Sequence, residues 1–589
     1  MMLIVSQCRR LLAAATPIRR VQVAVVFVLT IFGAIAELVT IGAVLPLLAL
    51  AADPSRATRL GMASDILGVI ETVSGLGPVG AAALLLAIAA VAATVVRFAL
   101  NWASFKFVYG LEQDLALTIF GRTLRQPYGW YLKQNSSALI SGQDQIRMVV
   151  STVLNPLMLS ATSALMAAAM GIFLFLLNPG AALIAIVTIG GTYALISFAA
   201  RRKVAAISGA IGGSYEARVR ILQESVGGIR DIILDRSEAV FERRLLEVED
   251  NFRRMTIVGN MIQIGPRLLV EGVAIVLVAA LALWFSLQPN GLVGALPVLG
   301  AMALGAQRML PMVQQIYVGI SNFGLYGGSV DNVLRLLDTP VDQANQLAAA
   351  VNPVPFRRSI RFDELSFSYA TGRPALQSIN LDIARGERMG LVGKTGSGKS
   401  TLVDILMGLL SPTEGRLLID GQPLDLAGLV NWRAQIAHVP QTIFLADDSV
   451  AANIAFGQPA AEIDRDEVRR AAADAGLDDF LHALAEGLDT RVGERGMRLS
   501  GGQRQRIGIA RALYKRATVL VLDEATSALD DDTERAVMAS VERLGRDLTI
   551  VMIAHRLTTL SGCDRVVRLA NGRIEAIGSY AEMNPPRRS

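Results

Sequence analysis

The stretch Gly393-Lys394-Thr395-Gly396-Ser397-Gly398-Lys399-Ser400 decides the fold of the second half of this 589-residue chain. It follows Arg388-Met389-Gly390-Leu391-Val392, which predicts a buried strand, and it precedes an apolar helix from Thr401. This is the phosphate-binding pattern G-x-x-x-x-G-K-[ST] in the strand–loop–helix context that it requires, so a chance glycine-rich turn is disfavoured. Glycines let backbone N–H groups close around phosphate oxygens, and the helix start favours an anion. We expect Lys399 to reach the β- and γ-phosphates of a nucleotide and Ser400 to ligate Mg²⁺.

A second segment supplies acidic groups. Val519-Leu520-Val521-Leu522-Asp523-Glu524 is a continuous apolar run that ends in two carboxylates, which is typical of a buried parallel strand. Ligands bind at the carboxyl ends of such strands. We expect Asp523 to hold Mg²⁺ through water and Glu524 to polarise the attacking water. The alternative interpretation is a pair of helix N-cap residues.

Between these segments, Leu499-Ser500-Gly501-Gly502-Gln503 opens an arginine-rich helix. It resembles the signature of ATP-binding cassette (ABC) proteins, and the resemblance extends from about Ser359 to Met583. It implies a soluble α/β P-loop ATPase domain at 359–589 that uses ATP and Mg²⁺. In the family, the signature serves the nucleotide on the opposite subunit. The chain has one set of motifs, so we expect a homodimer or a pair with a second half.

The resemblance also assigns roles to individual residues. Tyr369 resembles the aromatic residue that stacks on adenine, Gln441 the glutamine that senses Mg²⁺ and the membrane domain, and His555 the switch histidine on the γ-phosphate. Ser527-Ala528-Leu529-Asp530 resembles the loop across the dimer interface. The expected catalytic residues are Glu524, His555, Gln441 and Lys399, and the expected metal-binding residues are Ser400, Gln441 and Asp523. The expected nucleotide-binding residues are Tyr369, Gly393, Thr395, Gly396, Ser397, Gly398, Lys399, Ser400, Thr401, Ser500, Gly501, Gly502 and Gln503.

The first half of the chain has a membrane composition. The whole sequence is 52% hydrophobic and only 18% charged, which nearly excludes a wholly soluble or a disordered protein. Two cysteines exclude a disulfide scaffold. A membrane span needs about 20 apolar residues, and each of the two charge-free stretches, 148–200 and 272–307, is long enough for two. With 21–50 and a segment from about 79 past 97, this predicts six spans.

Basic clusters predict the orientation of these spans. Two basic clusters are typical of cytoplasmic segments. They predict a protein of the bacterial inner membrane whose N- and C-termini are both on the cytoplasmic side. They comprise Arg9, Arg10, Arg19 and Arg20 before the first span, and Arg201, Arg202 and Lys203 after the fourth. We therefore expect a six-helix membrane bundle with long cytoplasmic extensions at 1–335, a linker at 336–358 and the cassette at 359–589.

Three connecting segments have their own patterns. Apolar residues between Leu60 and Val73 recur at helical spacing, which fits a helix in the outer interface or an ordinary amphipathic loop helix. Gln126-Pro127-Tyr128-Gly129-Trp130-Tyr131 sits where the first coupling helix of the family is expected. The stretch from Glu224 to Asp231 resembles part of its second cytoplasmic loop. Simple helix breaks are the alternative for the last two.

Charge inside the spans bears on the substrate. Arg97, Arg267 and Arg308 fall in apolar surroundings, and an arginine at a span centre costs about 3 kcal/mol on insertion scales. Such residues usually face a cavity, and arginine binds pyrophosphate bidentately. For two of these arginines the sequence leaves an alternative to substrate binding. Arg97 could extend to the membrane interface, and Arg267 could form an ion pair with Glu271, four residues further along the helix. We expect Arg308 to have no nearby carboxylate and to be the strongest substrate residue.

Six spans followed by one cassette resemble an exporter half-transporter that works by alternating access. The segments Val439–Val450 and Asn453–Gly457 are similar to bacterial lipid-linked oligosaccharide flippases, a group with a short external helix and with intramembrane arginines facing a lipid pyrophosphate. This resemblance implies ATP-driven flipping of a polyprenyl-pyrophosphate-linked oligosaccharide or a similar anionic lipid. Alternatives are a multidrug, lipid A or peptide exporter, a soluble cassette ATPase and a non-hydrolytic channel or regulator. The apolar spans disfavour the soluble ATPase, and the complete catalytic set disfavours the channel.

Overall fold

The computed structural model describes residues 2–52, 62–177, 179–286, 291–341, 356–369, 372, 374–524, 534–535, 539, 547–554 and 557–583. The chain divides into two compact units. The first comprises Met1–Leu124 and Gln134–Pro340, and the second comprises Arg125–Lys133 and Val341–Ser589. Of the expected linker at 336–358, residues 342–355 lie outside the described residues, and 336–338 are the end of a helix.

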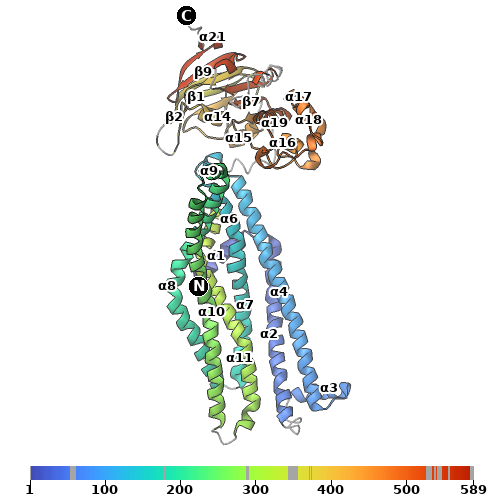
Figure 1. The fold of residues 1–589 in the computed structure, drawn as a ribbon. Helices are drawn as coiled ribbons and strands as arrows, with labels where there is room; N and C mark the ends of the chain where they lie inside the picture. Colours follow the sequence, from blue (N-terminus) through green and yellow to red (C-terminus); the bar gives the residue numbers. More distant parts are fainter. Residues whose placement is uncertain are drawn as a thin grey trace. The chain divides into compact units, whose positions relative to one another are not determined.

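The first unit is helical (Figure 1). Its elements are α1 (Met2–Ala13), α2 (Pro17–Ala52), α3 (Met62–Ser74), α4 (Pro78–Leu124), α6 (Ser136–Val149), the π-helical turn η2 (Val150–Leu154), α7 (Asn155–Leu177), α8 (Pro179–Gly227), α9 (Ile229–Leu234), α10 (Glu238–Ser286), α11 (Gly291–Leu325) and α12 (Gly327–Asp338). Helix α7 ends at Leu177 and α8 begins at Pro179, because proline has no N–H to continue a helix but is well suited to start one.

The six predicted spans all fall on helices. Among the described residues, four segments are long and apolar enough to cross a membrane: Pro17–Leu47, Pro78–Leu124, Ser136–Leu176 and Ala182–Ala200. The fifth and sixth predicted spans correspond to α10 and α11, and their crossing stays a prediction. Helices α4, α8 and α10 continue far beyond the length of a span, as the long charged extensions of the sequence predict.

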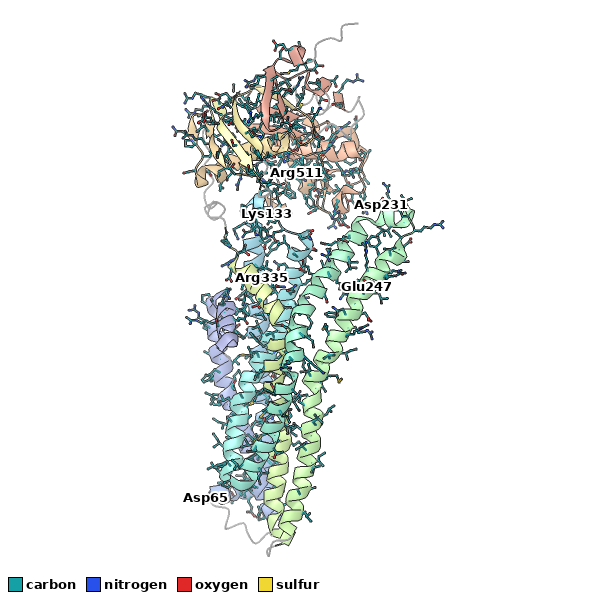
Figure 2. The ribbon with its side chains drawn as sticks, turned by 90° about the vertical axis from the view of Figure 1, so that its left-hand side faces the viewer. Asp65, Lys133, Asp231, Glu247, Arg335 and Arg511 are labelled. Atoms are coloured by element: carbon teal, nitrogen blue, oxygen red, sulfur yellow. The ribbon has the colours of Figure 1, made fainter. Side chains whose placement is uncertain are left out.

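Helix α3 lies at one end of this unit. Asp65 on α3 and Asp231 on α9 are at opposite ends of the helices in Figure 2, as expected for an outer segment and a cytoplasmic one. Leu67 is buried against the ends of α2 and α4, where it packs with Leu50, Ala81 and Ala82. In contrast, Ile66 and Val73 are exposed. The predicted apolar stripe therefore divides between a packed side and an exposed side.

The second unit contains two sheets. Strands β2 (Pro374–Ala384), β1 (Ser359–Ser368), β4 (Glu414–Ile419) and β5 (Gln422–Pro423) form an antiparallel sheet in that order. The other sheet has the order β10 (Arg573–Gly578), β9 (Arg565–Ala570), β3 (Arg388–Val392), β8 (Thr549–Ile553), β7 (Val519–Asp523) and β6 (Ile436–Val439). Its strands are parallel except for β10, and β3 and β7 are buried, which confirms the two predicted core strands.

Helices cover and extend these sheets (Figure 1). They are α14 (Lys399–Leu406), α15 (Leu426–Ala434), α16 (Val450–Ile454), α17 (Arg465–Asp474), α18 (Asp478–His482), α19 (Gly501–Tyr514) and α21 (Tyr580–Met583), with short 3₁₀ turns η3 (Ala460–Glu462), η4 (Gly487–Asp489), η5 (Glu494–Gly496) and η6 (Leu557–Leu560). The segment Arg125–Lys133, which includes α5 (Tyr128–Tyr131), belongs to this unit, and a Cβ on Gly129 would lie 3.6 Å from Leu410.

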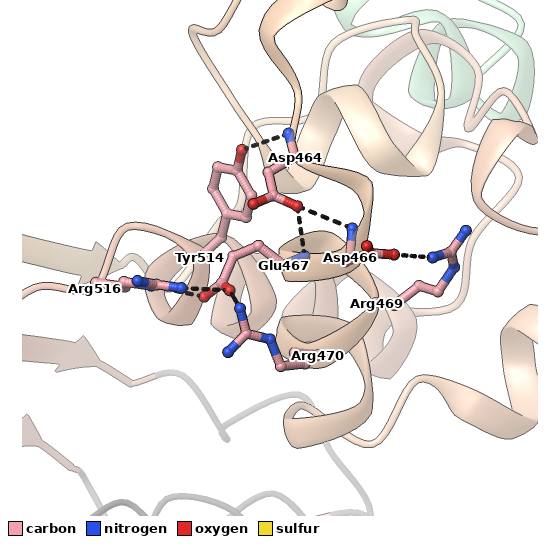
Figure 3. A network of polar contacts seen from close by, with 7 residues as sticks. All are labelled: Asp464, Asp466, Glu467, Arg469, Arg470, Tyr514 and Arg516. Carbon is pink, nitrogen blue, oxygen red and sulfur yellow. Dashed lines mark hydrogen bonds and ion pairs between the residues drawn. The ribbon is translucent and has the colours of Figure 1, made fainter.

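A polar network joins α17 to the end of α19 (Figure 3). The Asp464 carboxylate caps α17 by accepting hydrogen bonds from the backbone N–H groups of Asp466 and Glu467, at 3.1 and 3.0 Å. Glu467 in turn accepts two hydrogen bonds from Arg516, just beyond α19, at 2.9 and 2.6 Å. Together these contacts position the helix that begins with the signature segment, although exposed ion pairs contribute at most about 1 kcal/mol each.

Candidate functional site: a nucleotide site and an arginine-lined cavity

The phosphate-binding loop follows β3, which lies between β9 and β8. Lys399 is only 7% exposed, and its Nζ donates hydrogen bonds to the carbonyl oxygens of Gly393 at 2.8 Å and Lys394 at 3.2 Å. The loop backbone thus encloses the ammonium group of Lys399. Ser397 is also buried, and within the described part of the chain its hydroxyl has no hydrogen-bond partner. A closed backbone loop with a buried cation and an unpaired hydroxyl fits phosphate oxygens.

Two glycines of this loop are required by space and backbone geometry. A Cβ on Gly393 would lie 2.4 Å from the carbonyl oxygen of Leu569 and 2.5 Å from the Ser397 hydroxyl. Gly398 has φ = +102°, and a Cβ there would lie 2.6 Å from the carbonyl oxygen of Ala375. Larger residues would displace the loop from the neighbouring strands, so the motif glycines set its shape.

The expected acidic and amide residues lie together. Asp523 ends β7, and Gln441 follows β6, so both come from carboxyl ends of parallel strands at one edge of the sheet. The Gln441 Nε2 donates a hydrogen bond to the Glu524 Oε2 at 2.7 Å. Glu524 has φ = +49°, a left-handed conformation that is uncommon for a side-chain-bearing residue, and its N–H donates to the carbonyl of Ile553 at 3.0 Å. The backbone thus holds this carboxylate in a constrained position.

The signature segment begins α19 with a capping box. The Ser500 hydroxyl accepts a hydrogen bond from the Gln503 N–H at 3.2 Å, and the Gln503 side-chain oxygen accepts one from the Ser500 N–H at 2.8 Å. Gly501 and Gly502 form the first turn without side chains that would cover it. This arrangement exposes a helix start suited to an anion. That this helix start contacts the nucleotide bound to a second subunit stays a prediction.

Tyr369 lies beside the phosphate-loop helix. Its hydroxyl is 3.2 Å from the Thr401 hydroxyl, and its ring packs edge-on against Phe367 at 4.9 Å between centroids. Tyr369 is 39% exposed, which is compatible with the stacking role that the family resemblance implies. The other family positions, Ser527–Asp530 and His555, lie outside the described residues.

The expected metal donors have suitable chemistry. Hydroxyl, amide and carboxylate oxygens, which Ser400, Gln441 and Asp523 carry, are the hard donors that Mg²⁺ prefers. In the described ranges, no cluster of three or more His, Cys, Asp or Glu residues could hold a metal ion.

Comparison with known proteins supplies the family. The model of the ABC transporter transmembrane region matches residues 23–291, and the ABC transporter model matches residues 376–527. The chain is 32% identical to an ATP-dependent lipid A-core flippase of Cupriavidus metallidurans, over 83% of this chain and 82% of that relative. A flippase of the same description from Ralstonia nicotianae is 33% identical, over 80% and 79%.

The chain belongs to the ABC exporter family. A bacterial Atm1-family ABC exporter structure with ATP bound is also similar, with a TM-score of 0.75, 23% identity and 96% coverage of both chains. That likeness supports the fold. As an ABC exporter half-transporter, the protein couples ATP hydrolysis to transport.

The membrane unit of this exporter corrects one sequence-based expectation. Arg308, on α11, does have a carboxylate nearby: its Nη1 donates to the Glu37 Oε2 at 3.2 Å. Arg97, on α4, forms an ion pair with the other oxygen of Glu37. The expectation that Arg308 lacks an acidic partner was wrong. Glu37 is 271 residues away in the chain, so only the packing of the helices brings the two side chains together. Arg97 and Arg308 line one cavity of about 280 Å³.

Arg267 is placed differently. Its Nε donates to Glu271 Oε1 at 2.7 Å, one helical turn along α10, and both side chains are exposed in the single chain. This is the ion pair that the sequence offers as the alternative interpretation. Arg267 does not line the cavity of Arg97 and Arg308. Its role in substrate binding stays a prediction.

Sequence reasoning missed Asp404 of the cassette. Burial, together with the charge of Asp523, raises the pKa of Asp404 from 3.8 to about 6. The raised pKa means that the folded protein disfavours the ionised carboxyl. The resulting destabilisation is fully present above pH 6, declines as the pH falls from 6 to 4, and vanishes below 3.8. The carboxyl is close to the expected Mg²⁺ residue, yet nothing in its local sequence marks it.

We therefore expect Asp404→Asn to stabilise the nucleotide-free protein at pH 7.5 by about 1 kcal/mol, after allowance for partial solvent exposure. Thermal unfolding of wild type and variant between pH 4.5 and 7.5 measures the effect. The gap in Tm should narrow as the pH is lowered. A gap that is constant or widens toward acid pH would contradict the charge explanation.

Proposed function

We propose that this exporter moves an amphipathic lipid with a phosphoryl headgroup across the bacterial inner membrane, as a homodimer with cytoplasmic termini. The observation that carries the substrate proposal is the cavity lined by Arg97 and Arg308 within the spans. Arginine is costly in a membrane and is retained where a cavity or an anion uses it. Its planar guanidinium matches phosphoryl oxygens bidentately.

The remaining walls of this cavity suit such a headgroup. Helices α4, α7 and α11 contribute polar groups that can hydrogen-bond phosphate or sugar oxygens, and apolar groups that tolerate an acyl chain. The polar lining residues are Asn101, Thr162, Ser163, Gln307 and Gln315, and the apolar ones are Leu100, Leu159, Met166, Pro311 and Met312.

Two lipid classes fit this chemistry. Flippases of lipid A-core are the named relatives at 32–33% identity, which favours a phosphorylated glycolipid of that type. The short helix α3 after the first span favours the second candidate, a polyprenyl-pyrophosphate-linked oligosaccharide, through the flippase resemblance of the sequence. Both carry phosphoryl groups. A multidrug or peptide substrate would not need the paired arginines.

The geometry supports the following proposed roles in ATP hydrolysis. Lys399 binds phosphate oxygens in exchange for the carbonyls that it now contacts, and the loop of Gly393, Gly396 and Gly398 lets N–H groups approach. Glu524 polarises the attacking water, and Gln441 orients that carboxylate. Bound Mg²⁺ would neutralise charge on the phosphate oxygens. His555 is proposed to contact the γ-phosphate.

The substrate proposal is tested with Arg308→Ala. We expect the variant to lose at least about 90% of the stimulation of ATPase activity by diphosphoryl lipid A, because the cavity loses one of two guanidiniums. The ratio of stimulated to unstimulated hydrolysis in lipid nanodiscs is the measurement. Arg147→Ala, an exposed arginine outside the cavity, is the matched control. Full stimulation of Arg308→Ala would remove the phosphoryl-lipid argument, and stimulation by polyprenyl-pyrophosphate glycan alone would select the second candidate.

A further inference from the structure

Glu37 is a buried carboxylate inside a predicted membrane span. It lies on α2, and its side chain is 2% exposed. One turn away, Ala34 packs in an apolar cluster with Leu100, Met166 and Met312. An ionised carboxylate in such surroundings requires close partners, since desolvation strongly disfavours an isolated charge. The structure supplies two such partners.

Those partners come from two other helices. Arg97 of α4 contacts Glu37 Oε1 through Nη2, and Arg308 of α11 contacts Oε2 through Nη1 at 3.2 Å. Each carboxylate oxygen thus has its own guanidinium, and one side chain ties α2, α4 and α11 together. Without the carboxylate, the two guanidiniums would carry like charges at short range and would repel each other.

The guanidiniums also face outward from Glu37. In the single chain, Arg97 is 41% and Arg308 37% exposed, and both line the cavity of about 280 Å³, which Glu37 does not line. A guanidinium has five N–H donors in a planar fork. One nitrogen of each contacts Glu37, so further donors are available on the cavity side. The trio carries a formal net charge of +1, which attracts an anion without leaving the carboxylate unpaired.

We propose that Glu37 is a positioning residue that holds Arg97 and Arg308 side by side as a two-armed receptor for a phosphoryl group. The carboxylate binds the rear of both guanidiniums, and the phosphoryl oxygens bind the front. This rests on the proposed transport of a phosphoryl lipid and adds the residue that sets the geometry of its binding site. Glu37 itself does not touch the substrate.

Glu37→Gln distinguishes a positioning role from a purely electrostatic one, because the two roles predict opposite changes in lipid affinity. Removal of a negative charge near an anion site should tighten binding if electrostatic attraction alone acts. If Glu37 orients the arginines, its loss should weaken binding, since bidentate recognition depends on the angle between the two forks. We expect the Kd for diphosphoryl lipid A to rise at least about tenfold in the variant.

The experiment measures equilibrium binding of fluorescent diphosphoryl lipid A to the full-length protein in nanodiscs. Saturating ADP occupies the α- and β-phosphate positions of the nucleotide site, and competition by inorganic phosphate is read as displacement of the fluorescent lipid itself. Displacement of the lipid by millimolar phosphate indicates recognition of the phosphoryl group alone, and weaker displacement indicates that the lipid portion contributes. Glu112→Gln, which removes a carboxylate paired with Arg147 outside the cavity, is the control and should change Kd less than about twofold.

Two further variants make the test specific. Glu37→Asp keeps the charge but is one methylene shorter, and should weaken binding by about threefold or more; it also serves if Glu37→Gln fails to fold. In a protein that already carries Arg308→Gln, Glu37→Gln should raise the Kd for diphosphoryl lipid A by less than a further factor of about three, because Glu37 acts through the arginine pair.

Unchanged or tighter binding by Glu37→Gln, or an unchanged Kd in Glu37→Asp, overturns the positioning role. Absence of wild-type binding to both diphosphoryl lipid A and a polyprenyl-pyrophosphate saccharide would instead contradict the proposed function on which the role rests. The two failures are therefore distinguishable.

Discussion

Glu524→Gln is expected to reduce steady-state ATP hydrolysis at least about 100-fold while ATP binding is retained. The carboxylate follows the carboxyl end of β7, on the side of the sheet where the phosphate loop begins after β3, and Gln441 donates a hydrogen bond to it at 2.7 Å. Glutamine has nearly the same size and can keep a hydrogen bond at this position. It cannot accept a proton from water, so the chemical step should lose the group that we propose polarises the attacking water.

Two measurements are required for this variant. Phosphate release in the presence of Mg²⁺ and ATP gives the turnover, and equilibrium binding of labelled ATP gives the affinity. Glu414→Gln, an exposed glutamate on β4, is the control and should hydrolyse ATP at a rate close to wild type. Turnover of Glu524→Gln within tenfold of wild type would show that another group activates the water.

Lys399→Ala should weaken ATP binding at least about tenfold and abolish detectable hydrolysis, because the buried ammonium is the cation that the loop encloses. It also leaves the carbonyls of Gly393 and Lys394 without the hydrogen bonds that they accept at 2.8 and 3.2 Å. Because the ammonium would exchange these carbonyls for phosphate oxygens, the loss of these hydrogen bonds affects the nucleotide-free loop, and the weaker ATP binding comes from the lost phosphate contact.

The same loop offers a matched comparison. Lys394 is exposed, and only its backbone carbonyl contacts Lys399. Lys394→Ala should therefore change the ATP Kd less than about threefold, as measured by the same binding titration. Equal losses in the two variants would mean that overall positive charge, rather than the enclosed ammonium, binds the nucleotide.

The nucleotide site was largely predictable because its signals are local. The phosphate loop, the strand ending at Asp523 and the capping box of Ser500 and Gln503 are each contained in a few consecutive residues. Their meeting follows from the parallel sheet, which brings carboxyl ends of strands to one edge. The Gln441–Glu524 contact joins positions 83 residues apart, and only the family resemblance linked them in advance.

The membrane unit shows the opposite case. Hydropathy predicted where the helices lie, because a span is a property of consecutive residues. It could not predict that Glu37 lies between Arg97 and Arg308, since that depends on which faces of α2, α4 and α11 pack together. Glu37 was visible as the sole charge of its span, and a buried acid is a signal for a buried base. Periodicity gave no means of choosing its partners.

The central claim, ATP-driven movement of a phosphoryl lipid, is tested most directly by transport in reconstituted liposomes. Diphosphoryl lipid A and a polyprenyl-pyrophosphate saccharide, each labelled and placed in the leaflet that faces the cassettes, are assayed separately with and without ATP. We predict ATP-dependent appearance of one of them in the opposite leaflet with the wild-type protein and none with Glu524→Gln. Equal movement with and without ATP, or ATP-driven movement of neither lipid, would contradict the claim.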